Sequence, residues 1–115
     1  MTRPFVLLGL ALVLGGCSRE PKTLGAFAES APKTIAEARQ SPADTVLTLH
    51  GTMTKKCPIA GCWFMLRDET GIIKVDTQAA GFVVVEVPLN TTLTVAGRVL
   101  TNGTERVLEA TGVRY

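Results

Sequence analysis

Cys57 and Cys62 are the side chains of this sequence whose type and spacing best suit chemistry. They enclose Pro58 to Gly61, so four residues separate the two thiols. Cysteine sulfur forms disulfides, binds soft metals and takes part in thiol–disulfide exchange. The spacing matches neither the common zinc motifs nor thioredoxin-like enzymes. We therefore consider a structural disulfide, a metal site and a redox-active pair side by side.

A structural disulfide between Cys57 and Cys62 is the simplest expectation. Closing so short a loop removes unfolded-chain entropy worth about 2 kcal/mol. The alternative is a copper or zinc site, because two thiolates favour Cu(I) or Zn(II). Such a site needs further ligands, and the sequence supplies no firm set. His50 is the single histidine and lies about 23 Å from Cys57 along an extended strand. Met53 and Met65 offer thioethers, but both occupy strand positions that favour core packing.

A redox-active pair would need a thiol with a lowered pKa. Lys55 and Lys56 precede Cys57 and could stabilise a thiolate, although two lysines also keep a loop solvated. Trp63 follows Cys62 directly. Its indole could stack on a ligand, or it could plug the end of a small barrel. We take Trp63, Lys55 and Lys56 as candidates for ligand contact.

The sequence offers no equipment for catalysis. Ser18, Ser30 and Ser41 all precede the expected strands, so no nucleophile forms a recognisable triad with His50. No glycine-rich phosphate loop is present either. We therefore expect that the protein is not an enzyme.

Length and charge narrow the possibilities further. The 115 residues suffice for one small domain. Twelve basic and ten acidic side chains give a formal charge of +2, and aromatic residues make up 5%. A near-neutral domain has no field strong enough to attract nucleic acid by charge alone. Nucleic-acid binding is therefore disfavoured.

The first sixteen residues have the pattern of an export signal. Arg3 supplies a positive start, and an apolar run of residues 5–14 follows. From residue 5 to residue 16 a helix would be about 18 Å long, whereas the hydrocarbon core of a bilayer measures about 30 Å. The run is therefore too short to span a membrane and fits a secretory signal peptide.

The sequence Leu14-Gly15-Gly16-Cys17 resembles the lipobox of bacterial lipoproteins. The resemblance implies that residues 1–16 are removed and that Cys17 carries a palmitate-like lipid anchor in the membrane. Ser18 stands where that family has an inner-membrane retention aspartate. This implies an exported lipoprotein on the periplasmic face of the outer membrane, in the cell envelope. Residues 17–33, which show no sustained period, are expected to be a lipidated flexible tether.

Residues 34–115 are expected to form the folded domain. Thr34 and Glu37 fit a capping box for a short helix ending near residue 40. From residue 45 apolar and polar residues alternate, which predicts strands at 46–54, 63–67, 72–76, 92–100 and 106–113. No helix is expected between the third and fourth strands, so that connection is expected to be minimal. The pattern predicts an all-β fold, a small five-stranded antiparallel barrel with a short N-terminal helix.

This order of elements resembles the OB-fold. The stretches TIAEARQSPADTVLTLHGTM and LRDETGIIKVD resemble secreted bacterial OB-fold proteins, in which an R-D-x-T-G turn joins the second and third strands. The segment CPIAGCWFML resembles a bacterial OB-fold family with a Gly-Cys-Trp motif and no assigned activity. The resemblance implies a fold and a compartment. Because no equipment for catalysis is present, we expect a non-catalytic module that binds an unknown protein or small ligand through the loop of Cys57, Cys62 and Trp63. A copper- or zinc-binding lipoprotein is the alternative, and a nucleic-acid-binding OB-fold is a further one.

Overall fold

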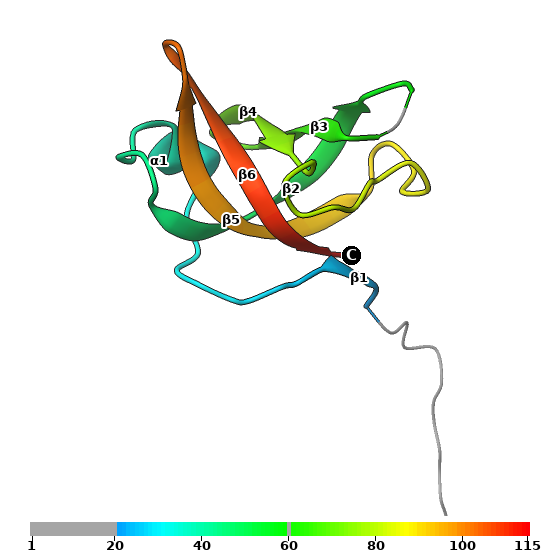
Figure 1. Ribbon diagram of the computed structural model, residues 1–115. Coiled ribbons are helices and arrows are strands. Elements are labelled where there is room, and N and C mark those ends of the chain that lie inside the picture. Colours follow the sequence, from blue (N-terminus) through cyan, green and yellow to red (C-terminus); the bar gives the residue numbers. More distant parts are fainter. Residues whose placement is uncertain (1–20, 60) are drawn as a thin grey trace, which may run out of the picture.

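The computed structural model describes residues 21–59 and 61–115 (Figure 1). The proposed signal peptide and Cys17 lie outside the described residues. Within them, five strands form a closed barrel with one short helix at one end, so the predicted all-β OB-like fold is confirmed. The elements in chain order are β1 (Thr23–Gly25), α1 (Ile35–Arg39), β2 (Val46–Lys56), β3 (Trp63–Asp68), β4 (Gly71–Asp76), β5 (Thr92–Asn102) and β6 (Glu105–Arg114).

The barrel closes through pairings that are distant in sequence. Strand β2 pairs with both β3 and β5, and β3 continues to β4. The predicted hairpin joins β5 to β6, with Asn102 paired to Glu105 and the turn at Gly103 and Thr104. These four pairings are antiparallel. The fifth, between β4 and β6, is parallel and completes the cylinder. The expectation of an antiparallel barrel therefore holds except at this seam.

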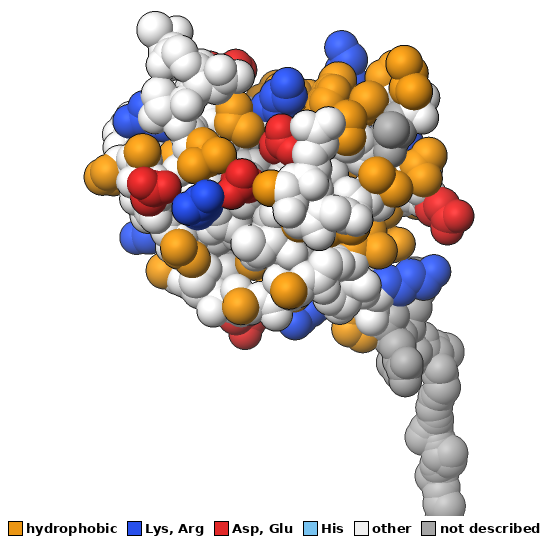
Figure 2. Space-filling model, viewed as in Figure 1, with side chains coloured by type: hydrophobic (Ala, Val, Ile, Leu, Met, Phe, Trp, Pro, Cys, Tyr) orange, Lys and Arg blue, Asp and Glu red, His pale blue; other side chains and the backbone are white. Residues whose placement is uncertain are grey.

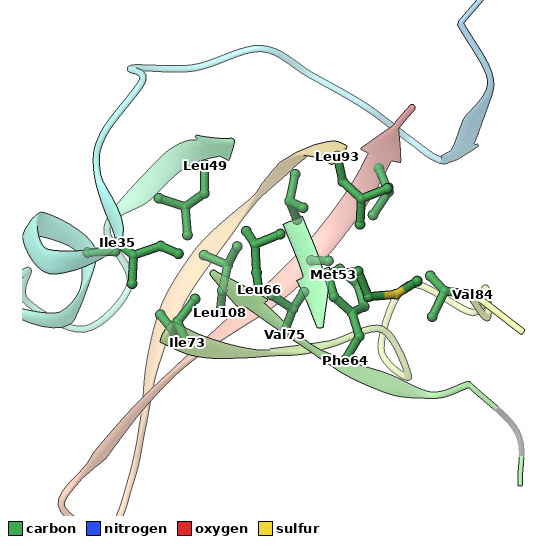
Figure 3. Close-up of a cluster of buried hydrophobic side chains, with 14 of the residues drawn as sticks. Ile35, Leu49, Met53, Phe64, Leu66, Ile73, Val75, Val84, Leu93 and Leu108 are labelled. Carbon is green, nitrogen blue, oxygen red and sulfur yellow. The ribbon is translucent and has the colours of Figure 1, made fainter. Parts of the chain in front are cut away.

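The alternation of residue types along the strands places the core as predicted. Leu47, Leu49 and Met53 on β2 are fully buried, whereas His50 on the opposite face is exposed. Figure 3 shows the cluster that fills the barrel, with Phe64 and Val84 close to Met53. Closure also requires near contact between strands. A Cβ atom on Gly51 would lie 2.5 Å from the Arg67 carbonyl oxygen, so only glycine fits at this bend of β2.

Helix α1 covers one end of the barrel. The Thr34 hydroxyl accepts the Glu37 N–H, and the Glu37 carboxylate accepts the Thr34 N–H, which confirms the capping box. Ile35 and Ala38 point into the core and are fully buried. None of the helices in the described ranges is long and apolar enough to cross a membrane.

The R-D-x-T-G turn between β3 and β4 fixes this helix from outside. The Asp68 carboxylate accepts the Ile35 N–H at 2.9 Å, the Thr70 N–H at 2.7 Å and the Gly71 N–H at 3.1 Å. The Thr70 hydroxyl donates to the same carboxylate and accepts the Ala36 N–H. The turn thus satisfies donors of the first helical turn that have no partner within the helix.

The segment before α1 differs from the expected flexible tether. Strand β1 pairs with β6, and Lys22 and Tyr115 exchange backbone hydrogen bonds of 2.6 and 2.9 Å. Further along, the Ala26 N–H donates to the Thr111 carbonyl and the Lys33 N–H to the Thr48 carbonyl. Composition alone predicted a mobile linker. The edge of β6 offers unpaired backbone groups, and this segment satisfies them.

The connection between β4 and β5 also differs from the prediction. No helix is present there, as expected, but residues 77–91 form a substantial loop. Val84 and Val87 from this loop are buried in the barrel or against it. The loop therefore forms part of the core and reaches the first connection of the barrel.

Candidate functional site

The candidate site lies on two loops at the end of the barrel where β2 passes into β3. The loop of residues 57–62 is held closed by its backbone. The Cys57 N–H donates to the Trp63 carbonyl at 3.0 Å, and the Gly61 N–H donates to the Cys57 carbonyl at 3.2 Å. Gly61 has a φ of +62°, and a Cβ there would lie 2.7 Å from the Val85 nitrogen. The glycine of the Gly-Cys-Trp motif is thus required by conformation and by space.

The structure brings Cys57 and Cys62 together. Their sulfur atoms lie 3.5 Å apart, with the Cys62 thiol donating to Cys57. This hydrogen bond, together with desolvation, raises the pKa of Cys62. A raised pKa disfavours the thiolate, whereas a reactive redox pair needs it. The raised pKa of Cys62 therefore does not support Cys62 as the reactive thiol of a redox pair.

The loop of residues 77–91 packs against the cysteine loop. The Thr77 N–H donates to the Cys62 carbonyl at 3.0 Å, and the Val84 N–H donates to the Gly61 carbonyl at 2.9 Å. Lys56 completes the contact from the end of β2. Its ammonium group donates to the carbonyls of Val85 at 2.9 Å and Val87 at 2.6 Å, with a longer contact of 3.5 Å to Val84.

These contacts show that Lys56 has a different role from the other two predicted ligand-contact residues, Lys55 and Trp63. The ammonium group of Lys56 binds the second loop instead of a thiolate, so its role here is structural. Lys55 is exposed. Trp63 is half-buried, and the Lys74 ammonium lies 5.2 Å from its ring centroid in a cation–π contact. Lys55 and Trp63 remain candidates for contact with a ligand.

The two loops present an apolar surface to solvent. Ile59 is 89% exposed, and three side chains of the second loop are also about half exposed: Val83 (44%), Val85 (51%) and Leu89 (49%). We call these four residues the loop patch. Figure 2 shows hydrophobic side chains gathered at the upper right, where Figure 1 places the two loops. Glu86, within the second loop, is exposed beside them.

The predicted additional metal ligands lie elsewhere. In the ranges 21–59 and 61–115, no group of three or more His, Cys, Asp or Glu side chains is arranged to hold a metal ion. Met53 is fully buried in the core. The His50 ring is hydrogen-bonded through Nδ1 to the Thr94 hydroxyl at 3.0 Å. It lies between two open grooves of about 520 and 420 Å³ on the side of the barrel. Met65 is half-buried on β3. In the described part of the chain, Cys57 and Cys62 therefore bring two thiols together, and no third His, Cys, Asp or Glu joins them.

Comparison with known proteins decides the family. A family model described as "Bacterial OB fold (BOF) protein" matches residues 16–114, nearly the whole chain. This chain belongs to the BOF family. The BOF assignment confirms the bacterial OB-fold that the R-D-x-T-G turn predicted. Membership in the narrower Gly-Cys-Trp group stays a prediction.

Among solved structures, the BOF barrel is similar to the hypothetical protein ygiW from E. coli. The TM-score is 0.59 at 20% identity, and the alignment covers 79% of this chain and 98% of that one. At this identity the likeness shows the fold alone. A search of curated proteins found no match.

Sequence reasoning found the cysteine loop but missed its partner loop. The sequence shows a short apolar segment from Phe82 to Val85 before Pro88, which by itself indicates nothing beyond a connection between strands. The sequence did contain a signal, because residues 83–87 are valine at every position except Glu86. Four valines within five positions exceed what one buried face can hold. Some of them therefore had to remain exposed.

Proposed function

We propose that this BOF protein is a lipid-anchored, non-catalytic module of the cell envelope that binds a protein partner through the loop patch. The observation that carries the proposal is the exposure of Ile59, Val83, Val85 and Leu89 on two loops that hydrogen bonds hold together. Contiguous apolar side chains on a folded surface mark interaction sites more often than isolated ones do.

Hydrogen bonds between the two loops hold these side chains in fixed positions at the surface. Lys56 and the backbone bond between Val84 and Gly61 fix their relative position. A surface that is already ordered loses less conformational freedom on binding. Trp63 and Lys55 border the loops and extend the surface with an aromatic ring and a positive charge. An apolar peptide segment with an acidic flank has the matching chemistry.

The cysteines have a supporting role in this proposal. The sulfur atoms need to approach by about 1.5 Å from their 3.5 Å separation to reach the length of a disulfide. In an oxidising compartment this bond would lock the loop that carries Ile59. We therefore propose that Cys57 and Cys62 form a structural disulfide in the exported protein.

Export and the anchor rest on the sequence of residues 1–17. Mass spectrometry of the membrane-extracted product tests them directly. We expect a chain that begins at Cys17 and carries the mass of a diacylglyceryl group. An intact Met1 end with unmodified Cys17 would refute the anchor.

Site-specific photo-crosslinking in intact cells tests the loop patch. A photoreactive amino acid at Val85 should give one discrete protein adduct. The same amino acid at Val46 provides a matched control, because Val46 is 61% exposed on β2, outside the two loops. Equal adducts from both positions, or none from Val85, would contradict a binding role for the patch.

A further inference from the structure

The anchor proposed above would reach the folded barrel through very few residues. Lys22 is bonded to Tyr115 by two backbone hydrogen bonds, and β1 continues this pairing along β6. Only five Cα–Cα steps separate Cys17 from Lys22. Fully extended, they span at most about 18 Å. About 5–7 Å of that length crosses the headgroup layer.

The barrel therefore has little freedom to leave a membrane that holds Cys17. The chain that follows Cys17 meets the barrel at β1 and the end of β6. This end of the barrel would therefore face the bilayer. Gly25 packs closely against the barrel as well, since a Cβ at this position would come within 2.7 Å of the Phe82 ring. The segment thus cannot swing about Lys22 without breaking contacts along its length.

The surface at this end is basic. Lys22 is exposed, and Arg114 lies opposite Thr23 in the β1–β6 register. The Arg114 guanidinium is stacked 4.1 Å from the centroid of the Phe27 ring. Within residues 21–59 and 61–115, neither cation forms an ion pair. Figure 2 shows basic side chains where the grey trace meets the barrel.

We propose that the barrel end formed by Lys22, Phe27 and Arg114 rests on the membrane and binds anionic lipid headgroups. This inference rests on the lipid anchor of the proposed function. Basic side chains near a negatively charged leaflet are attracted to it over roughly a Debye length of 8 Å. The short connection from Cys17 limits Lys22 to at most about 11–13 Å beyond the headgroups, so both cations can reach that range without unfolding any part of the barrel. Two such side chains favour the surface-bound orientation roughly 30-fold.

Acylation of lysines on the lipidated full-length protein in vesicles tests the inference. The vesicles contain phosphatidylcholine alone or with phosphatidylglycerol, and a membrane-impermeant ester is the reagent. Lys33 is the matched control, because it is an exposed lysine of the same segment beside α1. On anionic vesicles we expect Lys22 to react several-fold more slowly than Lys33, and high salt should restore its reaction.

Three variants separate headgroup binding from the mere shortness of the connection. A flexible insertion of about 20 residues after Ser18 lengthens the connection to roughly 27 Å on average. Protection of Lys22 on anionic vesicles should persist in this protein. Adding Arg114→Gln, which removes one positive charge, should reduce that protection roughly fivefold, whereas Arg114→Lys should retain it. Lys33 reactivity and thermal unfolding show whether each variant is folded.

The outcomes are distinct. A chain that does not float with vesicles refutes the anchor and this inference with it. A chain that floats while Lys22 and Lys33 react alike refutes the inference alone. Loss of protection on insertion, with no effect of lipid charge, also overturns headgroup binding. Protection that requires an added protein instead of phosphatidylglycerol would assign the basic end to a protein partner.

Discussion

The Asp68 carboxylate connects the β3–β4 turn to helix α1 by a hydrogen bond from the Ile35 N–H. Replacing Asp68 should remove this connection and lower the stability of the protein. In Asp68→Ala the carboxylate is lost with its four hydrogen bonds, from the N–H groups of Ile35, Thr70 and Gly71 and from the Thr70 hydroxyl. A lost helix cap costs about 1 kcal/mol, and a hydrogen bond to a charged acceptor about 1.5–3 kcal/mol. Because the four bonds share one side chain, these values do not add. We expect a destabilisation of about 2–4 kcal/mol.

Asp68→Asn should be milder, at about 1–2 kcal/mol. The amide retains one oxygen, which can serve the turn donors Thr70 and Gly71. Its NH₂ group then faces the Ile35 N–H, so the helix loses its acceptor. Glu69→Gln is the control in the same turn. Its side chain is exposed, and we expect a change within about 0.5 kcal/mol.

The pH dependence gives an independent check. Burial opposes ionisation of Asp68, but hydrogen bonds from Thr70, Ile35 and Gly71 outweigh it and hold its pKa below the usual value. A lowered pKa in the folded state means that the stabilisation is complete above about pH 4, the unfolded value. It is lost as the pH falls through the folded pKa. The stability gap between wild type and Asp68→Asn should therefore shrink on acidification.

Urea unfolding followed by the fluorescence of Trp63, the single tryptophan, measures these differences at a fixed redox state. A free energy of unfolding of Asp68→Ala within about 0.5 kcal/mol of the wild-type value would show that Asp68 does not hold the helix. An Asp68→Asn gap that is the same at about pH 7 and below about pH 4 would contradict the role of the carboxylate charge.

Three further changes test the loops and the barrel. Lys56→Met keeps the aliphatic stem of the side chain but removes the donors to the Val85 and Val87 carbonyls. Amide hydrogen exchange, measured by mass spectrometry, should therefore become faster in residues 77–91. The β5–β6 hairpin should stay protected. Cys57→Ser should lower the free energy of unfolding by about 2 kcal/mol under oxidising conditions, and the difference should disappear under reducing conditions if a disulfide is its source. Gly51→Ala should destabilise the barrel by about 1–3 kcal/mol, because the added methyl meets the Arg67 carbonyl; urea titration measures this.

Each of these has a result that would contradict it. Unchanged exchange in Lys56→Met would show that the carbonyl contacts do not order the loop. A Cys57→Ser deficit that persists in reductant would point to lost packing instead of a covalent bond. A Gly51→Ala protein as stable as the wild type would mean that β2 and β3 separate there at no cost.

The barrel strands could be predicted because their information is local. Alternation along β2 assigned Leu47, Leu49 and Met53 to the core, and Asn102-Gly103 marked the last hairpin. The capping box of α1 was equally local, since Thr34 and Glu37 lie one helical turn apart. Period and cap chemistry need no knowledge of distant residues.

What escaped prediction depends on partners far away in sequence. Asp68 fits a turn residue by its neighbours, yet one of its oxygens serves Ile35, thirty-three positions earlier. Lys56 fits a solvated lysine, yet its donors are used by a loop about thirty residues later. The sequence pattern around a polar residue does not indicate which distant residue it will form a hydrogen bond with. These roles of Asp68 and Lys56 therefore become visible only in the folded barrel.

If Cys17 carries the proposed lipid, Gly112 affects how far the domain can stand from that residue. A Cβ at this position would lie 2.6 Å from backbone atoms of Ala26 and Phe27, so any larger residue must push the incoming segment off β6. The next backbone contact is at Ala31, whose carbonyl accepts the Thr48 N–H. The slack between Cys17 and the barrel would then grow from about 18 Å to roughly 46–50 Å. In the proposed lipid-anchored protein, one hydrogen atom in place of a methyl group would thus limit how far the domain stands from the bilayer.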